Sequence, residues 1–342
     1  WSSDVCSSDL KFLVVGCGSI GKRHAANAAK LGPTAVYDAS REAAQAAATG
    51  KGIEVFSDLG LAMAWNPDGV IVATPHTSHI TVASQAIEAG AHVLIEKPIS
   101  NDVAGVGGFL DRAEALGRQV HVVCNMRFHP AIQAVRRSLG AVGQPRFVRA
   151  QYGNYLPDMR PGADYRALYC AQKSQGGGVI LDAIHEIDYL TWLFGAAVKV
   201  SCTAGRIGAL DIDVEDYAAI VLEHQNGTRS EVHLDYLQRF KRRGCEVVGA
   251  DGTLVWESEG KAPEQCTVRI VRAGAAGWER LLAVEAVDTA KQLADVSAQF
   301  AEAIAGKQTD LLGGRDALTV LHTALAAHRA AATGTSVSLV KQ

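Results

Sequence analysis

Short apolar runs alternate with alanine-rich stretches from residue 11 onward. This alternation is typical of a parallel β-sheet whose strands are joined by crossover helices. The apolar runs predict six strands, over residues 11–15, 35–37, 53–56, 69–73, 92–95 and 119–123. Two intervening stretches, 77–89 and 103–116, carry apolar residues at helical spacing and end near Gly90 and Gly117. Residues 11–125 therefore predict a Rossmann-type, doubly wound parallel sheet.

The second half of the chain has a different pattern. A long segment with glycine, proline and tyrosine, 152–178, precedes an apolar helix and then strands in which apolar and polar residues alternate. The runs around Asn226-Gly227 and Asp251-Gly252 predict two β-hairpins, and a last alanine-rich helix is predicted over 315–332. The predicted fold class is thus α/β, with a C-terminal α+β domain over 126–342 that has a mostly antiparallel open sheet.

Composition and charge narrow the class of protein. With 342 residues, 48% of them apolar, the chain can bury the cores of two domains, but no run approaches the roughly 20 apolar residues of a membrane-spanning helix. The net charge of −3, with both signs interspersed, predicts no nucleic-acid or membrane partner. One basic cluster, Arg239, Lys241, Arg242 and Arg243, fits either a solvated strand end or an anion-binding patch.

The cysteines and the first ten residues bear on location. Seven scattered cysteines without a CxxC pair favour reduced thiols in a cytoplasmic protein, and no metal site is predicted. Residues 1–10, WSSDVCSSDL, lack the basic start and apolar core of a signal peptide. We interpret them as a non-native or disordered tail.

A G-x-G-x-x-G pattern follows the first predicted strand and opens a helix. Gly16 permits the tight turn, Gly18 lets the backbone approach a pyrophosphate, and Gly21 allows close packing of helix and strand. Ser19 and Ile20 lie at the helix N-terminus, whose unpaired N–H groups and partial positive charge suit phosphates. The context predicts that these five residues bind a dinucleotide.

Asp38 ends the second predicted strand, where a carboxylate can accept the ribose hydroxyls of the adenosine and repel a 2′-phosphate. It therefore favours NAD as the cofactor. Ser40 and Arg41 follow at once, and an arginine there could hold a 2′-phosphate, so NADP stays possible. An alternative role for Asp38 is the N-cap of the next helix.

Thr74 and Pro75 end the fourth predicted strand at the same edge of the sheet, where a threonine or backbone group can face the nicotinamide. His79 is added to the predicted cofactor contacts. It and His76 also fit helix-start or packing positions.

Glu96-Lys97-Pro98 ends the fifth predicted strand, where ligands of open α/β sheets bind. Proline fixes its own φ and favours an extended residue before it, so Lys97 is held at the strand end. We predict a catalytic role for Lys97 and a cofactor contact for Glu96. The alternative is a lysine exposed to solvent.

Three glycines, 176–178, precede a run whose apolar residues recur at helical spacing and predict one helix. On this helix Asp182 and His185 share a face, with Cβ atoms roughly 5–6 Å apart. A carboxylate beside an imidazole orients it and raises its basicity. A hydride-transfer enzyme needs such a base for the alcohol proton. The alternatives are a packed core histidine and an aspartate that caps the helix.

The glycine loop, Glu96-Lys97-Pro98 and the Gly-Gly-Gly to His-x-x-Asp helix, in this order, resemble the glucose-fructose oxidoreductase and inositol dehydrogenase (Gfo/Idh/MocA) family. The resemblance runs from about Lys11 to Val340, and Val214-Glu215-Asp216 adds to it. It implies NAD(P)-dependent oxidation or reduction of sugars, polyols or sugar nucleotides, with substrate between the two domains. It also implies a homodimer or homotetramer formed through the C-terminal sheet.

The resemblance also assigns roles to residues. Lys97 would contact the nicotinamide ribose and the substrate hydroxyl, and His185 would be the acid/base. The Lys97-Pro98 peptide is often cis in such proteins. Asp182 departs from the family pattern, because the family commonly places this aspartate four residues before the histidine, which here is Leu181.

A further set of residues predicts recognition of the substrate. The segment from 155 to 166 is similar to a branch of the family found with amino-sugar or nonulosonic acid biosynthesis. Its basic and aromatic side chains could grip a carboxylate or phosphate. The predicted substrate-binding residues are Arg127, Tyr155, Arg160, Tyr165, Lys173 and His185, with Arg166 beside them.

The function predicted from these observations is an NAD-dependent dehydrogenase that acts on a carbohydrate hydroxyl. Two alternatives stay open within the same family. One is NAD-dependent glycoside hydrolysis, in which the cofactor is regenerated. The other is a non-catalytic dinucleotide-binding sensor, against which the presence of lysine, histidine and aspartate together argues.

Overall fold

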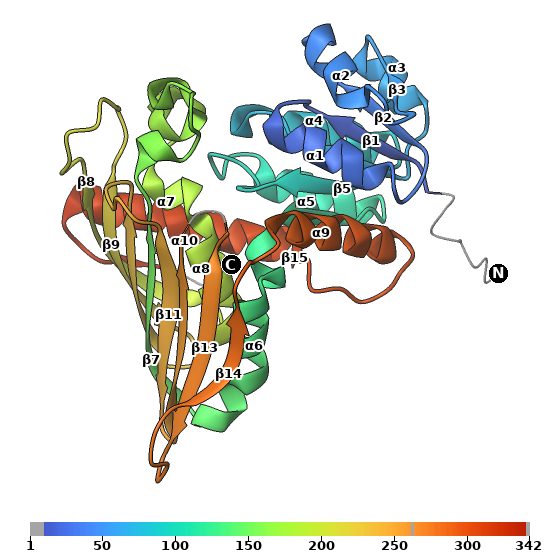
Figure 1. The fold of residues 1–342 in the computed structure, drawn as a ribbon. Coiled ribbons are helices and arrows are strands. Elements are labelled where there is room, and N and C mark those ends of the chain that lie inside the picture. Colours follow the sequence, from blue (N-terminus) through green and yellow to red (C-terminus); the bar gives the residue numbers. More distant parts are fainter. Residues whose placement is uncertain (1–9, 261–262, 340–342) are drawn as a thin grey trace. The chain divides into compact units, whose positions relative to one another are not determined.

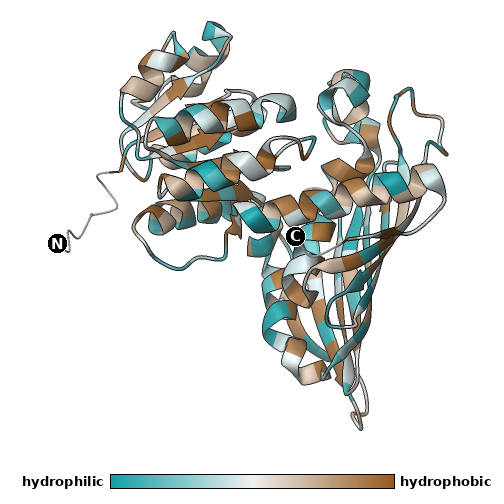
Figure 2. Cartoon of the chain, turned by 180° about the vertical axis from the view of Figure 1, so that it is seen from behind, coloured by the Kyte–Doolittle hydropathy of each residue, from teal (hydrophilic) through white to brown (hydrophobic). Residues whose placement is uncertain are grey.

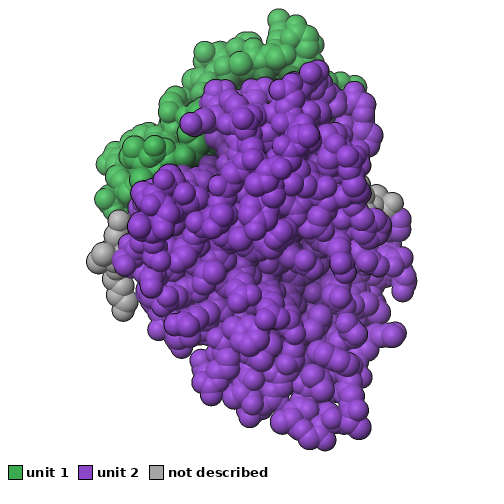
Figure 3. All heavy atoms as spheres, turned by 90° about the vertical axis from the view of Figure 1, so that its left-hand side faces the viewer, with its two compact units in different colours: residues 1–125, 289–318 green, residues 126–288, 319–342 purple. Residues whose placement is uncertain are grey.

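A computed structural model of the chain describes residues 10–260 and 263–339 (Figure 1). Apart from Leu10, the predicted tail lies outside the described residues. In Figure 2 the helices carry hydrophobic and hydrophilic residues together, as amphipathic helices do. The chain forms two compact units, which are coloured separately in Figure 3. Unit 1 is Trp1–Asn125 with Thr289–Leu318, and unit 2 is Met126–Asp288 with Thr319–Gln342.

Unit 1 contains a seven-stranded sheet in the order β15-β6-β5-β4-β1-β2-β3. Its strands are β1 (Phe12–Val15), β2 (Thr34–Tyr37), β3 (Glu54–Val55), β4 (Gly69–Val72), β5 (His92–Glu96), β6 (Val120–Val123) and β15 (Leu312–Gly313). All neighbouring strands are parallel except β15, which is antiparallel to β6. The strand order reverses between β1 and β4. That is the switch point at which open α/β sheets bind their ligands.

The strands of unit 1 are buried because helices pack against the sheet. Every residue of β1 and β4 is buried, as in parallel sheets that are covered on both faces. The helices are α1 (Ser19–Ala28), α2 (Arg41–Ala48), α3 (Leu59–Ala64), α4 (His79–Glu88), α5 (Val106–Ala115), α9 (Thr289–Ile304) and the start of α10 (Gly314–Thr333). The short 3₁₀ helix η2 (His76–Ser78) lies in this unit, and η3 (Asn125–Phe128) begins at its residue Asn125 and continues into unit 2.

Unit 2 contains a nine-stranded sheet in the order β14-β13-β12-β11-β7-β10-β9-β8-β16. Its strands are β7 (Pro145–Gly153), β8 (Ala197–Gly205), β9 (Tyr217–His224), β10 (Arg229–Asp235), β11 (Arg242–Gly249), β12 (Gly252–Glu259), β13 (Gln265–Arg272), β14 (Glu279–Val284) and β16 (Val337–Ser338). Within the described residues, β7 and β10 are the only parallel pair of this sheet. Buried and exposed residues alternate along β7 and β10, so one face of the sheet packs and the other is open.

Helices cover the packed face of this sheet. They are α6 (Pro130–Ser138), α7 (Val179–Asp182) and α8 (Ile184–Phe194), and the end of α10 also belongs to this unit. The connections are 3₁₀ turns, η4 (Leu139–Val142), η5 (Leu156–Asp158), η6 (Tyr165–Ala167), η7 (Tyr169–Ala171) and η8 (Lys173–Gln175). The last four of these turns lie in the predicted glycine, proline and tyrosine segment.

The predicted fold class is confirmed, and both predicted hairpins are present as β9–β10 and β11–β12. The prediction of a single helix after the three glycines is wrong. The helical segment is interrupted at Ala183, whose φ of −91° and ψ of 29° end α7 before α8 begins. The units also differ from the predicted domains, because residues 289–318 belong to unit 1: α9 packs on α1, and β15 extends the sheet beside β6.

Candidate functional site

The glycine loop of unit 1 has no room for larger residues at two of its three glycines. Gly16 has a φ of +94°, and a Cβ there would lie 2.5 Å from the Ala73 carbonyl oxygen. A Cβ on Gly21 would lie 1.9 Å from the Gly16 carbonyl oxygen. A Cβ on Gly18 would have nothing within 4 Å. Gly16 and Gly21 thus shape the loop, while Gly18 leaves space above the backbone.

The N-terminus of α1 is suited to an anion. Gly18 is its N-cap and offers no side chain for capping, the first turn has no acidic residue, and Gly18 and Ser19 are exposed. The first N–H groups of a helix have no partner within it and carry partial positive charge. The loop therefore fits the pyrophosphate of a dinucleotide.

Asp38 connects this loop to the end of β2. Its Oδ2 accepts a hydrogen bond from the Cys17 backbone N–H at 2.6 Å, and its Oδ1 accepts one from Ser40 N–H at 2.7 Å. The alternative of Asp38 as a helix N-cap is wrong, because the Ser40 side chain caps α2 through Ala43 N–H. Burial, and after it the charge of Asp38, raise the pKa of the Cys17 thiol to about 12, so it stays protonated at neutral pH. Asp38 therefore stabilises the glycine loop through Cys17, and its predicted contact with the adenosine ribose stays a prediction.

The end of β4 carries a buried polar atom that fits a ligand. The Thr74 Oγ1 is buried and has no hydrogen-bond partner among the described residues. Pro75 follows it and is exposed. A buried hydroxyl of this kind is rare in a protein without a ligand or water to satisfy it. Its place beside the glycine loop fits the predicted contact with the cofactor.

His79 joins the ends of β4 and β5. The ring is fully buried, with Nδ1 3.0 Å from the Pro98 carbonyl oxygen and Nε2 2.9 Å from the Thr74 carbonyl oxygen. Burial lowers the pKa of His79 despite these contacts. The packing role that the sequence also allowed therefore describes this geometry, and the predicted cofactor contact stays a prediction. His76 is also buried.

Glu96-Lys97-Pro98 is held by its neighbours within unit 1. The Glu96 Oε1 lies 2.7 Å from Nε2 of His24, a fully buried residue of α1, and its Oε2 accepts from the Lys97 backbone N–H at 3.2 Å. Burial raises the pKa of Glu96, but the hydrogen bond and charge of His24 outweigh it and lower the pKa overall. The Lys97-Pro98 peptide is cis, as the resemblance implies, and Lys97 is half-buried. The helix after the glycine loop and the lysine-bearing strand end are thus joined through the contact of His24 with Glu96.

In unit 2, Asp182 is the last residue of α7, and the half-buried His185 lies in the first turn of α8. The Asp182 Oδ1 accepts a hydrogen bond from the Tyr169 hydroxyl at 2.5 Å, and its Oδ2 accepts one from the Tyr236 hydroxyl at 3.2 Å. Neither α7 nor α8 has a side-chain cap, so the capping alternative for Asp182 is wrong. Sequence reasoning missed both tyrosines, which are 13 and 54 residues away from Asp182.

The glycines before α7 make room for protein atoms. A Cβ on Gly177 would lie 2.5 Å from the Tyr169 carbonyl oxygen, and one on Gly178, whose φ is +110°, would lie 2.3 Å from Glu215 Oε1. The same Glu215 oxygen accepts from Ile180 N–H at 3.1 Å and lies 3.2 Å from His328 Nε2. The structure shows that the glycines let the chain pack around the start of α7.

The predicted substrate residue Arg127 takes part in a buried ion pair. It is 4% exposed, its Nη2 lies 2.8 Å from Asp188 Oδ1, and its guanidinium stacks on Trp192 at 4.9 Å. Burying two charges is favourable only when they are paired this closely. The predicted substrate contact of Arg127 gains no support from this geometry and stays a prediction.

The other predicted substrate residues lie in or near the 3₁₀ turns of unit 2. Tyr155 stacks under Arg239 at 3.7 Å, and the Tyr165 hydroxyl accepts from Asp211 N–H at 3.2 Å. Arg160 and Lys173 are exposed. Arg166 is engaged with Asp164 through its Nε and Nη2. These residues remain predictions.

The basic cluster does not act as one patch. Arg239 stacks on Tyr155, Lys241 pairs with Glu264 at 2.5 Å, and Arg243 pairs with Glu186 at 2.6 Å. Three of its four cations therefore have protein partners.

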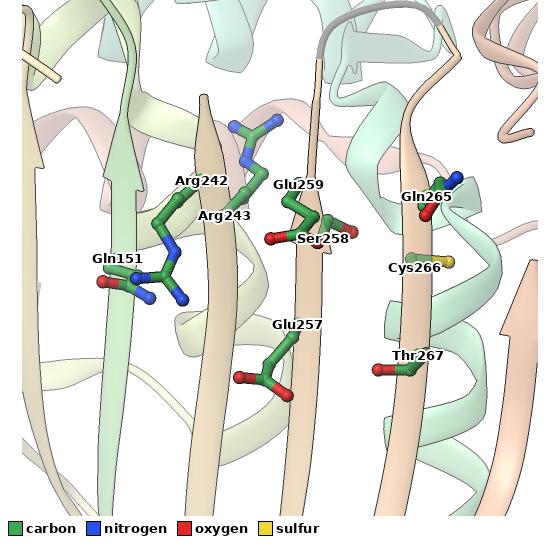
Figure 4. A pocket seen from close by; sticks show the side chains of 9 residues that line it. All are labelled: Gln151, Arg242, Arg243, Glu257, Ser258, Glu259, Gln265, Cys266 and Thr267. Carbon is green, nitrogen blue, oxygen red and sulfur yellow. The ribbon is translucent and has the colours of Figure 1, made fainter. Parts of the chain in front are cut away.

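A hollow of about 220 Å³ lies along β7, β11, β12 and β13 (Figure 4). It is lined by Gln151, Arg242, Arg243, Glu257, Ser258, Glu259, Gln265, Cys266 and Thr267. The predicted site residues do not include any of these. Among the described residues, no helix could cross a membrane, and no group of three or more His, Cys, Asp or Glu side chains could hold a metal ion.

The Rossmann-type sheet, with the glycine loop and the polar groups at the carboxyl ends of its strands, defines an oxidoreductase with a dinucleotide-binding Rossmann domain. Residues 10–124 match the model of the Gfo/Idh/MocA oxidoreductase family with an NAD-binding Rossmann fold, and residues 131–255 match the Gfo/Idh/MocA C-terminal domain. The chain belongs to the Gfo/Idh/MocA family, and its first unit is the NAD-binding Rossmann fold of that family.

Known relatives cover most of the chain. It is 30% identical to D-apiose dehydrogenase from Paraburkholderia graminis over 259 residues, which are 72% of this chain and 67% of that protein. It is 30% identical to 1,5-anhydro-D-fructose reductase from Ensifer adhaerens over 310 residues, 88% of each chain. The solved structure of levoglucosan dehydrogenase in complex with NADH covers 97% of this chain and 100% of its own, with a TM-score of 0.85 at 22% identity. At that identity the likeness shows the shared fold.

Proposed function

We propose that this protein is an NAD-dependent dehydrogenase that oxidises a CH–OH group of a sugar, polyol or sugar nucleotide, or reduces the corresponding carbonyl. The observation that carries the proposal is the position of Lys97 in the sheet of unit 1. It lies at the carboxyl end of β5, beside β4, which Thr74 follows, and two strands from β1, which the glycine loop follows. Glu96 contacts α1 through His24. The names of the relatives support the carbohydrate substrate.

In the proposed mechanism the bound NAD supplies the hydride acceptor. His185 takes the proton of the substrate hydroxyl as the hydride leaves the same carbon, so a carbonyl forms. The Lys97 ammonium stabilises the negative charge that develops on the oxygen, an effect worth a few kcal/mol in a site with little water. Asp182 stabilises the imidazolium of His185. The reverse sequence reduces a carbonyl.

NAD is the proposed cofactor, with NADP as the alternative. The fit rests on the uncapped helix N-terminus, the space above Gly18 and the buried Thr74 hydroxyl. In this proposal the Asp38 carboxylate would accept the adenosine ribose hydroxyls and repel the 2′-phosphate of NADP. Arg41 is exposed at the start of α2 and is the residue that could favour NADP.

The test follows nicotinamide absorbance with NAD and NADP against a panel of polyols, aldoses, amino sugars and nucleotide sugars. We expect turnover on a member of the panel, and a loss of at least a hundredfold in kcat for Lys97→Ala and for His185→Ala, with NAD affinity little changed by His185→Ala. Wild-type turnover in both variants would refute the assignment. Release of sugar from a chromogenic glycoside without net NADH would instead indicate the hydrolase, and tight NAD binding without turnover would indicate the sensor.

We also propose that the open face of the nine-stranded sheet joins copies of this chain into a homodimer or homotetramer. Two apolar side chains, Val198 and Val221, are exposed on β8 and β9 of the sheet. Light scattering after size-exclusion chromatography should give twice or four times the mass of one chain. The mass of a single chain would refute the proposal.

A further inference from the structure

We propose that Tyr169 and Tyr236 are positioning residues of the reaction, which fix the Asp182 carboxylate so that it supports the acid/base His185. This inference rests on the proposed function, because it takes His185 as the proton acceptor. The tyrosines act through Asp182 and do not themselves carry out the proton transfer.

The geometry assigns one hydroxyl to each carboxylate oxygen. Tyr169, in η7, donates to Asp182 Oδ1 at 2.5 Å, and Tyr236, which directly follows β10, donates to Oδ2 at 3.2 Å. A carboxylate with one donor rotates about its Cβ–Cγ bond, whereas donors on both oxygens define its plane. Because the helix breaks at Ala183, Asp182 lies outside the regular turn of His185, and helix geometry alone does not orient it.

Both tyrosines are anchored through their backbones. The Tyr236 N–H donates to the Asp216 carbonyl oxygen at 2.9 Å, and the Tyr236 carbonyl oxygen accepts from Leu156 N–H at 3.0 Å. The Tyr169 carbonyl oxygen accepts from Gln172 N–H at 3.1 Å. The two hydroxyls are therefore held by the fold and not by the carboxylate alone.

Tyrosine hydroxyls hold a carboxylate without cancelling its charge. Burial, and after it the charge of Asp182, raise the pKa of the fully buried Tyr236, so its hydroxyl stays a donor at neutral pH. A neutral hydroxyl donor adds no positive charge beside the carboxylate, so these two hydrogen bonds orient Asp182 without opposing its effect on an imidazolium.

The test compares three phenylalanine variants on the substrate found in the panel. Tyr169→Phe and Tyr236→Phe should each lower kcat about tenfold, as expected when one hydrogen bond to a charged group is lost, while KM and the dissociation constant of NAD change less than twofold. Tyr189→Phe is the matched control, because Tyr189 is as buried as Tyr236 but its hydroxyl has no hydrogen-bond partner among the described residues. It should keep the wild-type kcat.

A double-mutant cycle distinguishes positioning from a general structural effect. In an Asp182→Asn background, Tyr169→Phe and Tyr236→Phe should lower kcat much less than in the wild type. Full additivity, or wild-type kcat in both tyrosine variants while Asp182→Asn is impaired, would overturn the inference and leave the proposed function intact. Wild-type turnover in His185→Ala and Asp182→Asn would overturn the proposed function itself.

Discussion

The ion pair of Arg243 and Glu186 ties α8, the helix that carries His185, to strand β11 of unit 2. Glu186 is fully buried, and the Arg243 side chain is 10% exposed. Their hydrogen bonds join Nε to Oε1 at 2.6 Å and Nη2 to Oε2 at 3.0 Å. We predict that Arg243→Met lowers the free energy of unfolding by about 3–5 kcal/mol, because it leaves the Glu186 carboxylate buried and unpaired.

The predicted loss of free energy of unfolding depends on the burial of Arg243 and Glu186, so a double variant and an exposed control pair can test it. At about 2–4 °C per kcal/mol for a unit of this size, the melting temperature should fall by roughly 6–20 °C. The double variant Arg243→Met/Glu186→Leu should recover most of this loss, since an apolar pair can replace a buried ion pair at little cost. Arg149→Met is the matched control, because Arg149 and its partner Glu231 are 60% and 58% exposed, and should cost less than about 1 kcal/mol.

The assay is urea unfolding at pH 7, followed by circular dichroism, with equal m-values required before the free energies are compared. The single variant should also lose activity, since Glu186 follows His185 directly in the chain. A cost for Arg243→Met no larger than that of Arg149→Met, or a double variant no more stable than the single one, would refute the reasoning.

Three further predictions concern the loop, the cofactor and acid stability. Gly21→Ala should lower the melting temperature and NAD affinity together, because its Cβ would lie 1.9 Å from a backbone oxygen, whereas Gly18→Ala should weaken NAD binding alone; calorimetric titration and thermal melting separate the two. Asp38→Ala should shift the ratio of NADP to NAD dissociation constants at least tenfold toward NADP, about 1.4 kcal/mol, and an unchanged ratio would contradict its role. Burial raises the pKa of Glu264, but the His129 hydrogen bond and Lys241 outweigh it and lower the pKa from 4.5 to about 2. The contacts of the ionised Glu264 therefore contribute on the order of 3 kcal/mol to the free energy of unfolding above pH 4.5, and this contribution is lost as the pH falls toward 2. In Glu264→Gln, the free energy of unfolding measured in urea should change less with pH over that range.

Local sequence patterns were sufficient to predict much of the fold and the position of the glycine loop. The positions of six parallel strands, two hairpins and the glycine loop depend on spacing and turn residues within a few positions of one another. The same reasoning failed at Ala183, where the sequence continues the helical spacing but the chain breaks the helix. Glu215 contacts Ile180 and Gly178 there, and no periodicity reports a contact 35 residues away.

The sequence by itself predicted which residues carry chemistry: Lys97 at a strand end, Asp38 after another strand of the same sheet, and Asp182 and His185 near each other. Only the tertiary structure decided what holds them, with His24 on Glu96, Cys17 N–H on Asp38, and the hydroxyls of Tyr169 and Tyr236 on Asp182. The physical reason is the range of the two kinds of information. Backbone geometry and periodicity act over a few residues, whereas a buried polar group is satisfied by whichever donor the fold brings to it, wherever that donor stands in the chain.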